Sequence, residues 1–151
     1  MGEGSLAVRL TQCSNFAVRI LIYAGLNRHG PSPIPEIARA YGVSLDHLKK
    51  AAAELSRLGY MKAMRGRSGG VCLSRAPEDI SIGEVVRQTE GSSTLVECFD
   101  PASNTCSLRT DCKFRVALQE ALEAFYTVLD RHTLADLVKN REKLADCLGI
   151  K

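Results

Sequence analysis

Two short helices joined by a tight turn are predicted between residues 34 and 59, and this pair constrains the fold more than any other feature. Ile34–Tyr41 has helical spacing, Pro35 is tolerated in the first turn, and Gly42 ends the helix. Ser44 is predicted to cap a second helix running to Gly59, whose apolar face is made of Leu45, Leu48, Ala52, Leu55 and Leu58. Two helices joined by a glycine-containing turn are typical of a helix-turn-helix.

A β-hairpin is predicted directly after the second helix. Residues 60–64 and 71–74 have the composition of short strands, and residues 65–70 between them form a glycine-rich tip. A hairpin in this position makes the unit a winged helix-turn-helix, which we expect to span residues 8–77. A helix over residues 10–26, capped by Thr11 or Ser14, is predicted to precede the pair.

The rest of the chain is predicted to be helical around one irregular segment, so the fold class is mainly α with a small β-hairpin. A connecting helix at 81–87 and a turn-rich cysteine loop are expected within residues 78–110. Residues 111–151 are expected to hold a long C-terminal dimerisation helix over 111–130 and one more short helix after residue 133. The long helix carries an apolar stripe, which a second copy would cover: Phe114, Leu118, Leu122, Phe125 and Leu129.

The composition is that of an ordinary globular chain and argues against a membrane protein. The 151 residues are 45% apolar and 25% charged, and no apolar run approaches the length of a membrane span. Residues 1–5 lack the basic start and apolar stretch of a secretory signal, so we expect a cytoplasmic protein. The net charge of +3 permits binding of nucleic acid but does not argue for it.

A polar face at the start of the second helix predicts contact with DNA, because the major groove accepts one helix and its side chains read the base edges. The candidates are Ser44, Asp46, His47, Lys49 and Lys50. Arg65 and Arg67 at the hairpin tip suit a narrow minor groove, whose negative potential attracts arginine. The alternative is that the lysines form a solvated helix face and the glycines only turn the hairpin; His47 alone is a weak signal.

Three of the six cysteines, Cys98, Cys106 and Cys112, lie in one short segment and indicate a metal or redox site. Disulfides are not expected in the cytosol. Seven residues separate the first two and five the last two, which fits neither a closed zinc site nor the ferredoxin spacing. Three thiolates in a flexible loop can hold an iron–sulfur cluster and leave one iron without a cysteine. Reduced cysteines without a ligand, or a thiol redox switch, remain alternatives.

The position of Cys112 supports metal binding, because the start of the long helix favours the thiolate, which is the form that binds metal. The other cysteines, Cys13, Cys72 and Cys147, are scattered and are expected to be ordinary core or surface residues. An electron carrier would not need the hairpin. An enzyme is not expected, because the three histidines are dispersed and no nucleophile–base pair or phosphate loop is present.

Nearly the whole chain resembles the Rrf2 (Rrf-two) family of bacterial winged-helix regulators, which includes IscR, NsrR and RirA. The likeness is carried by residues 9–11, 15–19, 34–38, 65–70, 82–90, 124–125 and 133–137 and by the three cysteines. The resemblance implies a homodimer that binds double-stranded operator DNA and carries an iron–sulfur cluster on Cys98, Cys106 and Cys112. The cluster expected is 4Fe-4S, with 2Fe-2S as the alternative.

Two positions indicate which members the chain is most similar to. IscR-like chains have a histidine ligand where this sequence has Arg115, and NsrR-like chains offer an aspartate from the partner's first helix where this one has Asn15. RirA-like chains combine asparagine there with wider cysteine spacing. The resemblance therefore implies an iron-responsive repressor with Asn15 near its cluster; the alternative is a nitric-oxide-sensing, NsrR-like repressor.

Overall fold

The computed structural model describes residues 8–91, 94–108 and 111–151. Residues 1–7, which include the chain start discussed above, and residues 92–93 and 109–110 of the cysteine loop lie outside the described residues. The regular secondary structure of the described part is helical except for one two-stranded antiparallel hairpin. The predicted fold class, a mainly helical winged helix-turn-helix, is confirmed.

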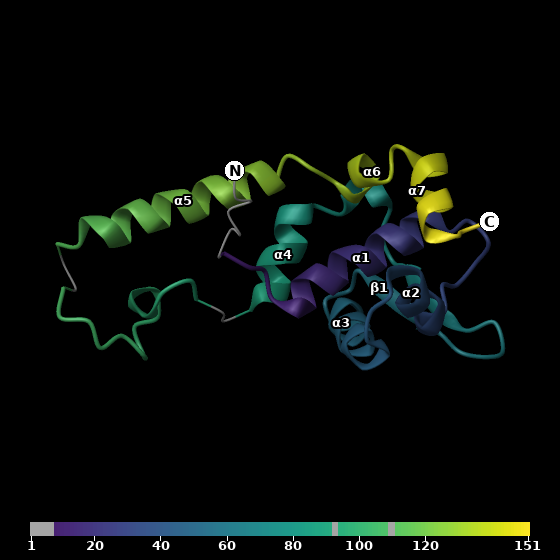
Figure 1. Ribbon diagram of the computed structural model, residues 1–151, viewed down its shortest axis with the longest axis horizontal. Helices are drawn as coiled ribbons and strands as arrows, with labels where there is room; N and C mark the ends of the chain where they lie inside the picture. Colours follow the sequence, from purple (N-terminus) through teal and green to yellow (C-terminus); the bar gives the residue numbers. More distant parts are fainter. Residues whose placement is uncertain (1–7, 92–93, 109–110) are drawn as a thin grey trace, which may run out of the picture.

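Helix α1 (Gln12–Leu26) is the centre of the molecule, and the helix-turn-helix packs below it in Figure 1. Helices α2 (Ile34–Tyr41) and α3 (Leu45–Arg57) have the predicted bounds to within two residues. Gly42 ends α2 as predicted: its φ of 62° is left-handed, and its N–H donates to the carbonyls of Ala38 and Arg39. The shared core is lined by buried side chains that include Ile20, Leu21, Ile37, Leu48 and Leu55.

Strands β1 (Met61–Met64) and β2 (Gly70–Leu73) form the predicted hairpin, with Met61 opposite Leu73 and Met64 opposite Gly70. The start of β2, next to the hairpin tip, is tied to the loop between α1 and α2 by two backbone hydrogen bonds of 2.9 Å between Ser32 and Val71. A Cβ atom on Gly70 would lie 2.4 Å from the Ser32 carbonyl. Gly70 is therefore required for this close approach of two backbones.

After a 3₁₀ turn, η1 (Pro77–Asp79), helix α4 (Ile82–Glu90) packs against α1, and a second 3₁₀ turn, η2 (Glu97–Phe99), follows in the cysteine loop. Helix α5 (Lys113–Leu129) extends away from the rest of the molecule, and the cysteine loop lies at its far end (Figure 1). The other end of α5 is held to α4, where Arg87 donates two hydrogen bonds of 2.7 and 2.5 Å to Asp130.

The predicted helix caps differ in their contacts. Thr11 caps α1, because its side chain accepts a hydrogen bond of 3.2 Å from the Ser14 N–H. Ser14, the other candidate, is instead buried and accepts a hydrogen bond of 2.8 Å from Thr89 Oγ1 on α4. Ser44 occupies the N-cap position of α3 but makes no side-chain capping bond, so that prediction was right in position and wrong in contact.

The tail after residue 133 corrects the prediction of one short helix. It forms two, α6 (Leu134–Leu137) and α7 (Arg141–Leu148), because the backbone leaves the helical region between them, at Val138 (φ −101°, ψ 13°) and again at Asn140 (φ −86°, ψ 53°). Leu134 and Val138 are buried against α1, beside Gly25. Among the described residues, no helix has the length and hydrophobicity needed to cross a membrane.

Candidate DNA-binding face and cysteine loop

Helix α3 presents an exposed polar face, because Leu48, Ala51, Ala52 and Leu55 bury its other side in the core. All five residues predicted to read DNA are exposed: Ser44, Asp46, His47, Lys49 and Lys50. Neither lysine makes an ion pair with any residue that the structure describes. His47 also has a packing role that its position in the sequence did not reveal, because its ring stacks on that of Phe16 at 6.3 Å.

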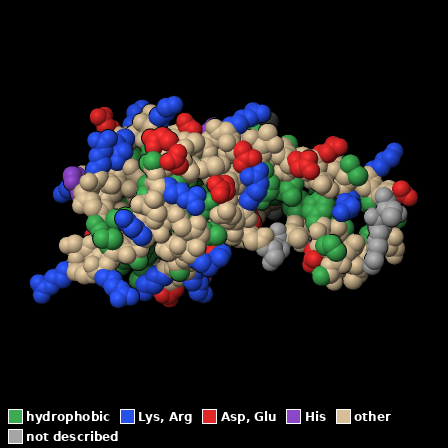
Figure 2. Space-filling view, turned by 180° about the vertical axis from the view of Figure 1, so that it is seen from behind, with side chains coloured by type: hydrophobic (Ala, Val, Ile, Leu, Met, Phe, Trp, Pro, Cys, Tyr) green, Lys and Arg blue, Asp and Glu red, His purple; other side chains and the backbone are tan. Residues whose placement is uncertain are grey.

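The hairpin tip places Arg65 and Arg67 in solvent. Gly66 between them has a φ of 115°, which favours glycine, and a Cβ on Gly69 would lie 2.6 Å from the Met64 carbonyl oxygen. The backbone geometry of the tip therefore favours glycine at both positions, whether or not the tip contacts DNA. Figure 2 shows Lys and Arg side chains gathered at the end of the molecule that lies away from the free end of α5.

The cysteine loop holds the three clustered cysteines at different places. Cys98 lies in η2, Cys106 in the irregular segment, and Cys112 at the N-cap of α5; all three are half-buried and free of disulfide bonds. Cys112 Sγ accepts a hydrogen bond of 3.4 Å from the Arg115 N–H, as expected for a side chain that caps a helix. The N–H of Cys106 donates to Asn104 Oδ1 across 2.9 Å, which fixes the local turn.

Arg115 connects the two ends of this loop. Besides its bond to Cys112, it donates from Nε to the carbonyl oxygen of Cys98 across 3.2 Å. In the sequence, this position stood out only because IscR-like chains have a histidine ligand there. The structure shows that an arginine here contacts both cysteine-bearing segments.

The structure does not bring the predicted ligands to one point. Within the described ranges, no three His, Cys, Asp or Glu side chains are close enough to hold one metal ion. Asn15 is exposed in the first turn of α1, and Figure 1 shows α1 apart from the cysteine loop. The donor set itself fits an iron–sulfur cluster, because three thiols without disulfide bonds lie on a segment with little regular structure.

A polar network that the sequence did not reveal holds the first turn of α1 to the end of α4. Glu90 Oε1 accepts hydrogen bonds from the N–H and the hydroxyl of Thr11, at 2.8 and 3.1 Å. Thr89 donates to Ser14 within the core. The only signal in the sequence was the placement of Ser14 and Thr89 on otherwise apolar helix faces. The network fixes the turn that carries Asn15.

Helix α5 has no buried residue. Phe114 is 68% exposed, Val128 51% and Phe125 41%, although all three are apolar. On its other side, a groove of about 610 Å³ separates α5 from η2 and α4. It is lined by Arg87, Phe99, Arg115, Gln119, Leu122, Glu123, Tyr126 and Thr127. The exposed apolar side chains are therefore open to a partner, whereas Leu122 of the predicted stripe faces the groove.

Known proteins resemble this chain over almost all of its length. The model of the Rrf2 family, described as iron-dependent transcriptional regulator, matches residues 10–140. The HTH-type transcriptional regulator NsrR of Bacillus subtilis is 44% identical over 145 residues, which cover 95% of this chain and 99% of that protein. NsrR of Geobacillus kaustophilus is 45% identical over 142 residues, covering 93% of this chain and 97% of its own length.

A third relative carries a different name. Protein aau3 of Rhizobium meliloti is 44% identical over 144 residues, covering 95% of this chain and 94% of that protein. Among solved structures, IscR of T. potens superposes with a TM-score of 0.73 at 25% identity, and the match covers 93% of both chains. The fold is thus shared with a solved regulator over nearly its whole length.

Proposed function

Because the chain belongs to the Rrf2 family of transcriptional regulators, we propose that it is a repressor whose DNA affinity depends on an iron–sulfur cluster held by Cys98, Cys106 and Cys112. It is a DNA-binding regulator and not an enzyme. The observation that carries the proposal is that Arg115 ties the Cys98 segment and Cys112 together at the start of α5. We further propose that the protein acts in the cytoplasm.

The proposed DNA contacts divide between the helix and the hairpin. Exposed side chains of α3, namely Ser44, Asp46, His47, Lys49 and Lys50, would enter the major groove and read base edges. Arg65 and Arg67 would reach the neighbouring minor groove or the phosphates. The charges of the two α3 lysines and of the two hairpin arginines support this role. No carboxylate of the described residues forms an ion pair with any of these four side chains.

We propose that two copies associate through α5 and read a two-fold symmetric operator. A monomer would leave Phe114, Phe125 and Val128 in water, whereas a second copy can cover the same stripe in a self-complementary contact. Because α5 carries the cysteine loop at one end and contacts α4 at the other, order in the loop would affect the spacing of the two α3 helices. In such a dimer, α1 of one copy would bring Asn15 to the cysteine loop of the other copy. Within a single chain, Asn15 lies apart from this loop.

The cluster type we propose is 4Fe-4S, with 2Fe-2S as the second possibility. In a 4Fe-4S cluster, three cysteines would leave one iron without a thiolate, and that iron would be open to small molecules and easily lost. The protein's part is to hold the thiols at the start of α5 and to supply a fourth group. A carboxamide such as Asn15 is a neutral and weak ligand for iron.

We propose two candidate signals, and the names of the relatives reverse the order of preference that the sequence suggested. The names of the Bacillus and Geobacillus relatives favour nitric oxide, the signal that the resemblance to NsrR-like chains implies, over the iron signal that the sequence suggested first. Iron supply remains the second candidate, because Asn15 replaces the aspartate of NsrR-like chains and because the aau3 protein, also 44% identical to this chain, does not carry the NsrR name.

One experiment separates these signals. The protein is purified without oxygen, and its ultraviolet–visible and Mössbauer spectra establish the cluster. Operator affinity is then compared after stoichiometric nitric oxide and after mild chelation, both anaerobically. Release by nitric oxide with the chelated protein still bound supports the nitric-oxide regulator. Release by chelation alone supports the iron regulator, and unchanged affinity in cluster-free protein contradicts cluster-dependent repression altogether.

A further inference from the structure

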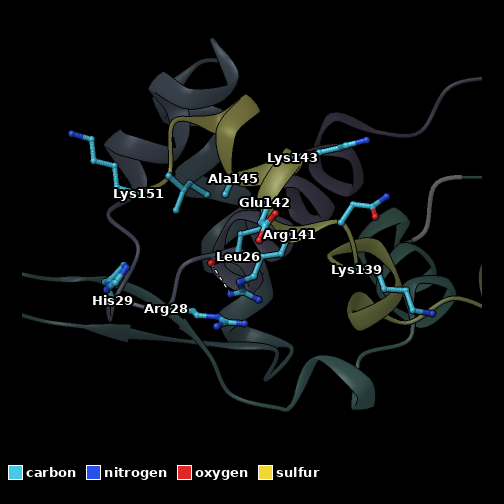
Figure 3. Close-up of a pocket in the computed structure, with 11 residues that line it drawn as sticks. Leu26, Arg28, His29, Lys139, Arg141, Glu142, Lys143, Ala145 and Lys151 are labelled. Carbon is cyan, nitrogen blue, oxygen red and sulfur yellow. Dashed lines mark hydrogen bonds between the residues drawn. The ribbon is translucent and has the colours of Figure 1, made fainter.

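A second hollow of about 610 Å³ lies where the end of α1 meets α7, away from the cysteine loop. Of its eleven lining residues, five are Lys or Arg and only one, Glu142, is acidic. In Figure 3, Arg28 and Arg141 lie close together at its centre and His29 lies beside Arg28, while Lys139 and Lys143 extend outward at the rim. Lys139 pairs with Asp136 at 3.7 Å, and the other four cations make no ion pair with the described residues, so positive charge is concentrated in a concave site.

Arg141 is held in place by the protein. Its Nη2 donates to the carbonyl oxygens of Gly25 and Leu26 at 2.9 and 2.7 Å, which satisfies the C-terminal end of α1. Burial and, after it, the charge of Arg28 lower the pKa of Arg141. Neither arginine pairs with a carboxylate in the described part of the chain. Two guanidinium groups thus face one hollow, and an anion between them would relieve their repulsion.

The first turn of α7 lines the same hollow, through Arg141, Glu142 and Lys143. The helix begins at Arg141, and its N-cap residue, Asn140, makes no side-chain capping bond. Uncapped N–H groups at a helix start attract anions, and phosphate is a common occupant of such positions. Leu26, Ala145 and Ile150 supply apolar surface beside these donors. The site therefore combines a polar cradle for an anion with a wall for an apolar body.

We propose that this hollow binds a small phosphorylated ligand, with its phosphate between Arg28 and Arg141 beside the first turn of α7. A volume of about 610 Å³ suits a compound of metabolite size. The free ligand is favoured over the DNA backbone as the source of the phosphate, because α7 and the DNA-reading α3 lie on opposite sides of α1 (Figure 1). This proposal does not depend on the cluster or on the signal it senses.

The test is calorimetric titration of the full chain with inorganic pyrophosphate, in phosphate-free buffer of fixed ionic strength and without DNA. We expect saturable binding that Arg28→Gln weakens by at least about tenfold, equal to about 1.4 kcal/mol. Lys143→Gln, at the rim, is expected to weaken it less. Arg131→Gln is the matched control, since Arg131 is also exposed but does not line the hollow. Unfolding temperatures of all variants check that the fold is intact.

Three outcomes would overturn the proposal: binding that never saturates, equal weakening by Arg131→Gln and Arg28→Gln, or full binding in Arg28→Gln. A second arm identifies the source of the phosphate by measuring affinity for operator DNA with short and long flanks. An effect of Arg28→Gln confined to long-flank DNA, with no pyrophosphate binding, would assign the hollow to the DNA backbone and reject a free ligand. Unchanged DNA affinity together with pyrophosphate binding supports the proposal.

Discussion

Arg115 donates a hydrogen bond from Nε to the carbonyl oxygen of Cys98 across 3.2 Å. Its backbone N–H simultaneously donates to Cys112 Sγ across 3.4 Å. Thirteen residues separate the two cysteines in the chain, and one arginine in the first turn of α5 contacts both segments. The start of α5 is thus a fixed support for a loop that has little regular structure of its own.

We predict that Arg115→Ala accelerates the disappearance of the anaerobic chromophore in the presence of a chelator, because the Cys98 segment is no longer tied to α5. Arg115→Lys is expected to restore this only in part, since an ammonium lacks the fixed fork of a guanidinium. The unfolding temperature of the cluster-free protein should change little. Chelation rates equal to those of wild type, with Arg131→Ala as the control, would contradict a positioning role.

Each of the three clustered cysteines is predicted to be required for the cluster. A site with three thiolates has no spare, so Cys98→Ala, Cys106→Ala and Cys112→Ala should each abolish the chromophore in anaerobic preparations. The controls are the scattered cysteines, replaced as Cys13→Ala, Cys72→Ala and Cys147→Ala, which should retain it. Iron and sulfide analysis provides the measurement. A full complement of both in Cys112→Ala would show that the assignment is wrong.

We predict that the hairpin contributes affinity with little base preference. Arg65→Ala and Arg67→Ala should each weaken operator binding and reduce the slope of log K against log salt by about 1, as expected when one phosphate is no longer neutralised. Fluorescence anisotropy over a salt series measures both quantities. An unchanged slope in both variants would exclude a role in neutralising phosphate charge.

Selectivity is predicted to reside in α3. Replacement of Ser44, Asp46 or Lys50 by Ala should cost about 1–3 kcal/mol on the preferred operator for each base whose hydrogen bonds are removed, with a smaller effect on unrelated DNA. Competition between operator and unrelated duplexes at one salt concentration measures this ratio. Equal weakening on both duplexes would reassign these side chains to the phosphate backbone.

The exposed stripe of α5 predicts a concentration-dependent dimer. Phe125→Glu places a charge where a second copy would pack, so monomers and weak operator binding are expected. Gln119→Glu adds the same charge on the groove side of α5 and should leave the dimer intact. Light scattering over a dilution series gives the mass. A dimer that tolerates Phe125→Glu would locate the interface elsewhere.

The Arg87–Asp130 pair predicts a pH-dependent contribution to stability. The hydrogen bond from Arg87, and then its charge, lowers the pKa of Asp130 below its ordinary value of 3.8. A carboxyl with a lowered pKa stabilises the fold above pH 3.8, and this effect disappears as the pH falls through the folded value. Asp130→Asn should therefore lower the unfolding temperature of cluster-free protein at pH 7.

The difference between wild type and Asp130→Asn should shrink as the pH falls below about 3.8. Thermal unfolding monitored by circular dichroism from about pH 7 to about pH 3 measures it. Asp79→Asn is the control, because Asp79 forms no ion pair with the described residues. A difference that is constant across this range would show that the destabilisation by Asp130→Asn is not electrostatic.

Local patterns were sufficient to predict most of the fold. The spacing of apolar residues in α2 and α3, Gly42 between them and the glycine-rich hairpin tip are signals within a few residues of the structure they specify. The single helix predicted after residue 133 was wrong because the chain breaks between Val138 and Asn140, and α7 then docks onto α1 through a hydrogen bond of Arg141 to Gly25. That hydrogen bond joins residues 116 positions apart, and no local pattern encodes it.

The candidate site was predictable in composition but not in arrangement. Residue type and spacing singled out the cysteines and the basic residues of the winged helix. They could not reveal that Arg115 contacts two cysteine segments, or that Arg28 and Arg141 share one hollow, because both depend on how distant segments pack. The packing of His47 on Phe16 was missed for the same reason.

The close approach of Gly70 to Ser32 fixes the residue where β2 begins, directly after the exposed part of the hairpin tip. Any side chain at residue 70 would push the hairpin off the loop between α1 and α2, and with it change the angle between the tip and α3. Arg65, Arg67 and Ser68 in the tip carry no such constraint, whereas the φ of 115° at Gly66 favours glycine. Related proteins could therefore vary these tip residues to suit new operators, while Gly70 keeps the hairpin at the same angle to α3.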